Sequence, residues 1–143
     1  MHRRTLLGLP VVGALAITLT ACGEDPPVPE PDQSGGGIVR YGDDPSQFGE
    51  LYLPDGVARG VVVVIHGGFW KSAYDYTLGS SLAASLAAEG WVAWNLEYRR
   101  VGDDPGGGGG TPATFDDVAA GIDKLAELDL DLSTVVTLGH SAG

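Results

Sequence analysis

The sequence predicts an α/β fold with an incomplete, doubly wound and mostly parallel sheet. The continuous β-branched run at 60–65 is typical of a strand that is buried on both faces of a parallel sheet. The run at 91–96 predicts a further strand, and the β-branched, apolar run at 133–138 predicts a buried one. Amphipathic segments at 77–89 and 112–128 separate these runs and predict helices. Because strands and helices alternate in this way, the helices are expected to cover the sheet as crossover connections.

The first 21 residues are expected to be an export signal rather than part of the fold. Arg3 and Arg4 precede an apolar run over 6–21, which is short for a membrane-spanning helix. The run ends in Leu-Thr-Ala-Cys22, which resembles the lipobox of bacterial lipoproteins, where the cysteine is lipidated and becomes the new N-terminus. We therefore expect Cys22 to anchor an exported protein to the outer face of a bacterial cell membrane. An ordinary signal peptide is the alternative, and the Arg pair leaves both Sec and twin-arginine export open.

Residues 22–37 are predicted to form a tether between the lipid and a folded domain at 38–143. Four prolines and four acidic residues fall between positions 23 and 37, and the segment ends in three glycines. Such a composition has almost nothing to bury, so it is extended where prolines dominate and flexible at the glycines.

The net charge excludes one class of partner. The chain carries a formal charge of −11, and loss of 1–21 would remove two arginines and no acid, which leaves 6 basic and 19 acidic residues, or −13. Such a surface repels nucleic acid and anionic headgroups, so no nucleic-acid partner is expected. With its single cysteine used as an anchor, the mature chain has no disulfide to form. The sequence gives no sign of an oligomeric state.

The remaining elements follow in order from Ile38. A strand is expected at 47–53, because Pro-Asp-Gly at 54–56 is a turn signal. Residues 101–110 include five consecutive glycines and are expected to form a surface loop. Each helix is expected to bury one apolar stripe. In the first helix the stripe is Leu78, Leu82 and Leu86 with Ala83 and Ala87; in the second it is Phe115, Val118, Ile122 and Leu125.

Two glycine-rich motifs each follow a predicted buried strand. His-Gly-Gly at 66–68 follows the strand at 60–65, and Gly-His-Ser-Ala-Gly at 139–143 follows the strand at 133–138. The second motif has the form G-x-S-x-G, in which a serine is held on a tight, strained turn between a strand and a helix. Small residues are needed there because side chains would strike neighbouring backbone. We expect the Ser141 hydroxyl to face amide hydrogens near residue 68; a plain turn is the alternative for the first motif.

Short motifs along residues 38–143 are similar to those of a known enzyme superfamily. They are H-G-G-F-W at 66–70, Tyr-Arg-Arg at 98–100 and G-H-S-A-G at 139–143, with a lead-in that includes Leu-Tyr-Leu-Pro at 51–54. Together they resemble the α/β-hydrolase superfamily on its esterase and lipase side. They look closest to its kynurenine-formamidase-like and xylan/feruloyl-esterase-like group.

The resemblance implies a serine hydrolase that acts on small carboxylic esters. Ser141 would be the nucleophile that forms an acyl-enzyme. The backbone N–H groups of Gly68, Phe69 and Ala142 would form the oxyanion hole. The residues that would support the two motifs are His66, Gly67, Gly139 and Gly143.

Neither His66 nor His140 is expected to be the general base, because in this superfamily the base follows the serine in chain order, after the acid. Acids that precede the serine, such as Asp117, are expected to be solvated; a pair with Arg99 or Arg100 is the alternative. No cluster of His, Cys and acidic residues has metal-ligand spacing, so no metal is expected, and no cofactor either.

The resulting prediction is the N-terminal part of a secreted, membrane-tethered serine esterase that lacks the triad acid and histidine. The chain alone is expected to be inactive and poorly soluble, since its final strand would be left as an exposed apolar edge. The alternatives are a non-catalytic surface lipoprotein that keeps half a hydrolase sheet, and an aryl-formamide amidase. The choice between acetyl, feruloyl, lipid and formamide substrates depends on pockets that these residues do not build.

Overall fold

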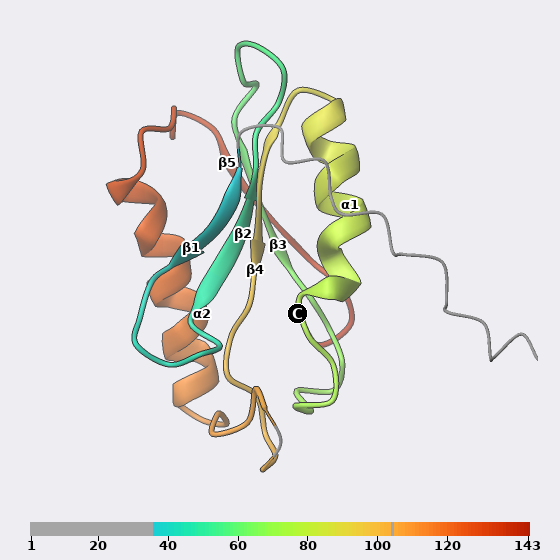
Figure 1. The fold of residues 1–143 in the computed structure, drawn as a ribbon, viewed down its shortest axis with the longest axis vertical. Coiled ribbons are helices and arrows are strands. Elements are labelled where there is room, and N and C mark those ends of the chain that lie inside the picture. The colour runs from blue at the N-terminus through green and yellow to red at the C-terminus, as the bar shows by residue number, and fades with distance from the viewer. Residues whose placement is uncertain (1–35, 104) are drawn as a thin grey trace, which may run out of the picture. The chain divides into compact units, whose positions relative to one another are not determined.

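The computed structural model describes residues 36–103 and 105–143, in which a five-stranded mixed sheet has a helix on each face (Figure 1). The strands are β1 (Gly37–Arg40), β2 (Phe48–Tyr52), β3 (Val61–Ile65), β4 (Val92–Leu96) and β5 (Val135–Gly139). They lie in the order β1-β2-β4-β3-β5, with β4, β3 and β5 parallel and β1 and β2 antiparallel to their neighbours. The predicted fold class is confirmed. The predicted signal and Cys22 lie outside the described residues.

Helices on opposite faces connect the three parallel strands. α1 (Thr77–Ala88) joins β3 to β4, and α2 (Ala113–Asp123), continued by the 3₁₀ helix η1 (Lys124–Glu127), joins β4 to β5. Because β4 and β5 flank β3 on opposite sides, right-handed crossovers put the two helices on opposite faces, as Figure 1 shows. In the part of the chain that the structure describes, no helix has the length and apolar character needed to span a bilayer.

β3 and β4 form the core, as their apolar sequences predict. Val61 and Val63 are fully buried, and so is the Trp94 ring on β4. The Trp94 indole N–H donates to the Gly121 carbonyl oxygen of α2 at 2.9 Å. The ring fits because Gly49 on β2 has no side chain: a Cβ there would lie 2.4 Å from it. The prediction that 60–65 contains a strand buried on both faces is confirmed, and so is the strand predicted at 91–96, which is fully buried.

The predicted buried face of α1 is only partly right: Ala83 is buried as expected, and Leu86 and Ala87 are half-buried. Leu78 and Leu82 are 60% and 38% exposed, whereas Gly79 and Ala83 face the sheet and are buried. A Cβ at Gly79 would lie 2.3 Å from the side-chain oxygen of Asn95 on β4. The helix therefore approaches the sheet through its smallest residues, and this close approach leaves Leu78 and Leu82 on its outer side.

The predicted buried face of α2 is only partly right. Leu125, in η1, is buried as expected, but Phe115 is 60% exposed. Thr114 and Asp117 occupy the buried positions instead, because both bind Arg99 beyond the end of β4. The Thr114 hydroxyl donates to the Arg99 carbonyl oxygen at 2.7 Å, and Asp117 accepts from the Arg99 guanidinium. Polar anchors thus set the rotation of this helix.

Within the described residues, β5 is an edge strand that pairs with β3 alone. Val135 and Val136 on this strand are 43% and 46% exposed. The expectation of an exposed apolar edge at the final strand is confirmed, whereas the prediction that 133–138 forms a buried strand is wrong for the described residues, because β5 has a partner strand on one side only.

Candidate active site

Two turns meet where β3 and β5 end. The strands pair in parallel register up to Ile65 and Gly139, so the chain leaves both at the same edge of the sheet. Gly67 lies directly against the turn after β5: a Cβ there would lie 2.5 Å from the His140 carbonyl oxygen and 3.0 Å from the Ser141 Cβ. The His140 N–H donates to the Ile65 carbonyl oxygen at 3.3 Å. The structure therefore brings together the two motifs that the sequence singles out.

The turn after β5 holds Ser141 in a strained conformation. Its φ is +58°, in the left-handed region that costs an ordinary L-residue roughly 1–2 kcal/mol, and the residue is exposed. The Gly143 N–H donates to the His140 carbonyl oxygen at 3.0 Å and closes the turn. A Cβ at Gly139 would lie 2.6 Å from the Gly143 carbonyl carbon, so the glycine at the start of the motif has a steric reason. An exposed serine on strained backbone is the geometry expected of a nucleophile elbow.

The loop after β3 has left-handed backbone at three successive residues. The φ angles are +116° at Gly68 and +54° at both Phe69 and Trp70. A Cβ at Gly68 would lie 2.4 Å from the Cβ of Tyr74, so only glycine fits there. Among residues 36–103 and 105–143, no acceptor takes the N–H of Gly68, Phe69 or Ala142. These three N–H groups at the two turns are therefore available to a ligand.

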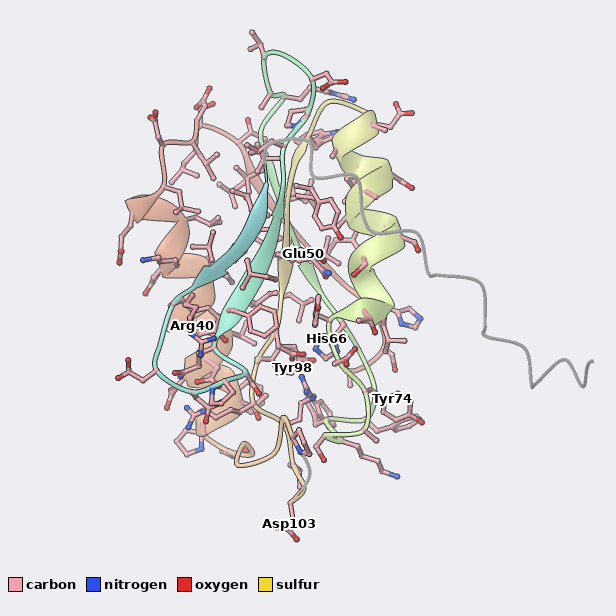
Figure 2. The ribbon with its side chains drawn as sticks, in the orientation of Figure 1. Arg40, Glu50, His66, Tyr74, Tyr98 and Asp103 are labelled. Carbon is pink, nitrogen blue, oxygen red and sulfur yellow. The ribbon has the colours of Figure 1, made fainter. Side chains whose placement is uncertain are left out.

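The segment after β4 holds this loop in place. The Val101 N–H donates to the Trp70 carbonyl oxygen at 2.7 Å, and the Ser72 N–H donates to the Val101 carbonyl oxygen at 3.0 Å. The Tyr98 hydroxyl donates to the His66 carbonyl oxygen. Figure 2 shows the His66 and Tyr98 side chains close together, and their rings stack with centroids 4.5 Å apart.

A buried charged cluster beneath the loop was not predicted from the sequence. Glu97, Arg100 and His66 are each at most 3% exposed. The Glu97 carboxylate accepts from the backbone N–H of Tyr98 at 2.7 Å and of Tyr76 at 3.2 Å, and it forms an ion pair with Arg100. The available signal was a Glu and an Arg close behind a fully buried strand, since buried charges are almost always paired.

Both ring nitrogens of His66 have partners inside the protein. Nδ1 lies 2.8 Å from the Gly67 carbonyl oxygen, whereas Nε2 lies 3.2 Å from a Glu97 oxygen and 3.3 Å from Arg100 Nη1. Burial lowers the pKa of His66 to about 4, so the ring is neutral at neutral pH. With both nitrogens occupied, His66 is not free to take a proton from Ser141. His140, by contrast, is exposed.

A second charged cluster fixes α2 to the end of β4. The Arg99 guanidinium donates to Asp117 through Nε at 2.8 Å and Nη2 at 2.6 Å, and the Gln47 side-chain amide donates to the same carboxylate at 2.7 Å. Burial alone would raise the pKa of Asp117, but the hydrogen bonds from Arg99 and Gln47 outweigh it and hold the pKa below its ordinary value. The expectation that Asp117 is solvated is therefore wrong, because the carboxylate is 1% exposed and paired.

The rim of the site is apolar and aromatic rather than metal-binding. Phe69, Trp70 and Tyr74 are exposed on the loop after β3, and Val101 is exposed beside them. Throughout the described ranges, no group of three or more His, Cys and acidic residues is arranged to hold a metal ion.

Comparisons with known proteins agree on this fold. A family model described as BD-FAE matches residues 50–143. A predicted thioesterase from Silicibacter sp. TM1040 has a similar structure, with 26% identity and a TM-score of 0.65 over 78% of this chain and 40% of its own. A thermophilic esterase from the Planctomycetes species Thermogutta terrifontis, in its propionate-bound form, has 23% identity and a TM-score of 0.61 over 79% of this chain and 44% of its own. The chain thus spans about two fifths of the length of these proteins. A search of curated proteins gave no match.

Proposed function

The chain belongs to the BD-FAE family, an α/β-hydrolase-like esterase family, and from this premise we propose that it contributes to an enzyme that hydrolyses small carboxylic esters. The nucleophile in this proposal is Ser141. The observation that carries the proposal is the contact between Gly67 and the Ser141 turn, because it brings an exposed serine next to a loop with unused N–H groups.

The proposed reaction has two halves. Ser141 Oγ attacks the acyl carbon while its proton passes to a general base, and the carbonyl electron pair moves onto oxygen. Collapse of this intermediate breaks the bond to the alkoxide, which takes that proton and leaves as the alcohol, so that an acyl-enzyme remains. Water then releases the acid and restores the serine. The N–H groups of Gly68, Phe69 and Ala142 would donate to the oxyanion in both halves. Loss of one such donor typically costs about 3–4 kcal/mol in the barrier.

In this proposal neither His66 nor His140 is the general base of the triad. His66 is buried with both nitrogens occupied, and His140 occupies the variable position of the serine motif. In this superfamily the general base and its acid both follow the serine in chain order. We therefore assign them to sequence beyond this chain, and we expect the 143-residue chain alone to show only the weak catalysis that remains when a triad is incomplete.

The direct test is hydrolysis of p-nitrophenyl acetate by a protein that carries this chain together with a downstream acid and histidine. Turnover and labelling by a fluorophosphonate should both disappear in Ser141→Ala. Ser133→Ala, which changes an exposed serine before β5, is the matched control and should keep both. Equal rates in Ser141→Ala and wild type would remove the enzymatic proposal and favour a non-catalytic surface protein.

The acyl group is a second, separable question. A panel of acetyl, feruloyl and long-chain acyl esters, with an aryl formamide as the amide competitor, should be compared by kcat/KM. The exposed Phe69 and Trp70 lie next to the proposed oxyanion donors, so they are the residues of this chain with which an acyl group would be in contact. A higher kcat/KM for the formamide than for the esters would show that the enzyme is an amidase with the same nucleophile.

We also propose that the enzyme is exported and held at the outer face of a bacterial membrane by a lipid on Cys22. The Leu-Thr-Ala-Cys ending of the apolar N-terminal run supports this proposal, and the acidic, proline-rich segment after it suits a tether. Radioactive palmitate should label the wild-type protein in the membrane fraction and should not label Cys22→Ser. Unchanged labelling of the variant would overturn the anchor.

A further inference from the structure

One buried charged group at the site has no part in the steps above. Arg100 is 2% exposed, and its guanidinium contacts the His66 ring on the side away from Gly67. We propose that Arg100 is a positioning residue of the oxyanion loop: it donates to Nε2 of His66, keeps the ring proton on Nδ1, and so fixes the peptide between Gly67 and Gly68. The inference rests on the proposed function, because it concerns an N–H that we assign to the oxyanion hole.

The proton on Nδ1 follows from the chemistry of its partner. Nδ1 of His66 lies 2.8 Å from the Gly67 carbonyl oxygen. A carbonyl oxygen only accepts hydrogen bonds, so a favourable contact at this distance requires a proton on Nδ1. The opposite neutral tautomer would set two lone pairs against each other.

The Nε2 side then needs a donor. Without a proton, Nε2 carries a lone pair that faces a Glu97 carboxylate oxygen at 3.2 Å, which is also an acceptor. Arg100 Nη1 lies 3.3 Å from Nε2 and forms an ion pair with that same oxygen, so one guanidinium group satisfies both acceptors. Arginine has hydrogen-bond donors and no acceptor, so it cannot accept a hydrogen bond from a protonated Nε2. Its presence therefore selects the neutral ring with the proton on Nδ1.

The Arg100 guanidinium is enclosed on two sides and bonded through Nη1, whereas its buried Nε has no hydrogen-bond partner among the described residues. The two Nη1 hydrogens are shared among the Glu97 carboxylate, His66 Nε2 and the Tyr98 carbonyl oxygen, which lies 2.8 Å from Nη1, so at least one of these hydrogen bonds is bifurcated. The guanidinium carbon lies 5.7 Å from the centroid of the Tyr98 ring. On the other side it packs on Gly106, where a Cβ would come within 2.1 Å of Nη2. A donor with this little freedom can select one tautomer of the ring beside it.

The position of the proton matters because a carbonyl and the following N–H belong to one rigid unit. The 67–68 peptide bond is trans, so the Gly68 N–H points opposite to the Gly67 carbonyl. Two successive glycines allow this peptide many orientations, and the hydrogen bond from His66 removes that freedom. Arg100 thus acts on the Gly68 N–H through the histidine ring, without contact with a substrate.

The test is the protonation pattern of the His66 ring at pH 7, read from long-range ¹H–¹⁵N correlation spectra of the ¹⁵N-labelled protein that carries this chain together with a downstream acid and histidine. We expect Nδ1 to carry the proton and Nε2 to give the signal of an unprotonated nitrogen, with a scalar coupling across the hydrogen bond to Arg100 Nη1. In Arg100→Met the unprotonated Nε2 signal should be lost, because Nε2 then faces Glu97 alone and takes a proton. The Gly68 amide should shift and exchange faster with solvent.

Arg99→Met is the matched control. It removes the neighbouring guanidinium, which binds Asp117 and not His66, and it should leave the ring pattern unchanged. A wild-type ring with the proton on Nε2, or an Arg100→Met ring with an unchanged pattern, would overturn the inference. If Arg100→Met does not fold, the wild-type proton position and the coupling to Nη1 still decide. The readout needs no turnover, so failure of the esterase proposal and failure of this one give different results.

Discussion

Arg99 and Arg100 are neighbours in the chain, yet they stabilise two different parts of the molecule. Arg99 is partly exposed, with 26% of its side chain open to solvent, and it fixes α2 through Asp117. Arg100 is almost completely buried and fixes the loop that carries the proposed oxyanion donors. The comparison teaches that burial decides how much the free energy of unfolding falls when an arginine loses its partner. Water can replace a partner of Arg99, but it cannot reach Arg100.

The largest effect is expected from Glu97→Leu. This change leaves the Arg100 charge buried without a counter-charge, and such a loss costs about 3–5 kcal/mol in the free energy of unfolding. Urea unfolding at pH 7 measures it. Glu97→Gln keeps the shape and part of the hydrogen bonding, so it should cost less. A loss below about 1 kcal/mol in the leucine variant would contradict the buried pair.

Lowering the pH should separate the two clusters. The pKa of His66 falls from 6.5 to about 4 on folding, so between these values the unfolded chain binds more protons. The free energy of unfolding should therefore decrease as the pH falls from about 6.5 to about 4, by up to about 3 kcal/mol from this group. The depressed pKa of Asp117 acts in the same sense but at lower pH: its contribution is present above 3.8 and is lost only as the pH falls below that value.

Urea titrations at several pH values between 7 and 4 measure this slope. His66→Asn should flatten it, whereas Asp117→Asn should leave it unchanged down to about pH 4. The same slope in wild type and His66→Asn would show that His66 is not the group responsible.

A smaller effect is expected from Asp117→Asn at pH 7. The variant loses a charge-assisted pair, but Arg99 can turn to solvent, so the cost should be about 1–2 kcal/mol. Thermal unfolding of this variant and of Glu97→Gln, measured side by side, compares the two clusters with both carboxylates made neutral. Equal losses would mean that burial does not distinguish them.

The smallest effect is expected from Leu78→Gln. The sequence predicts that Leu78 is a buried residue of α1, but the structure leaves it 60% exposed. Its replacement should change the free energy of unfolding by no more than about 0.5 kcal/mol. A loss of 2 kcal/mol or more would restore the face predicted from the sequence.

The strands and the two turns of the site could be predicted because each depends on local chemistry. A continuous apolar run such as 61–65 is stable only in the interior of a sheet. The glycines at 67 and 139 mark places where two backbone segments come close together. The face of α1 could not be predicted in this way. Leucine spacing defines a stripe, but it does not say that Gly79 lets the helix come so close to Asn95 that two of the leucines are left outside.

The charged cluster beneath the site could not be predicted from the sequence, for a different reason. His66 and Glu97 are 31 residues apart, and no periodic pattern links them. The sequence shows a Glu and an Arg behind a buried strand, but only the parallel pairing of β3 and β4 brings them to the histidine. Likewise, the preference for a solvated Asp117 failed because the position of Arg99 relative to α2 is set by the sheet.

The two hydrogen bonds that Val101 makes with the chain at Trp70 and Ser72 link the proposed oxyanion loop to the run of five glycines at 106–110. Gly106 and Gly109 bond back to the two ends of the Arg100 backbone, so the glycine run starts from the same anchor. A change in the length of that run would therefore displace the loop with the proposed oxyanion donors through the backbone itself rather than through side chains.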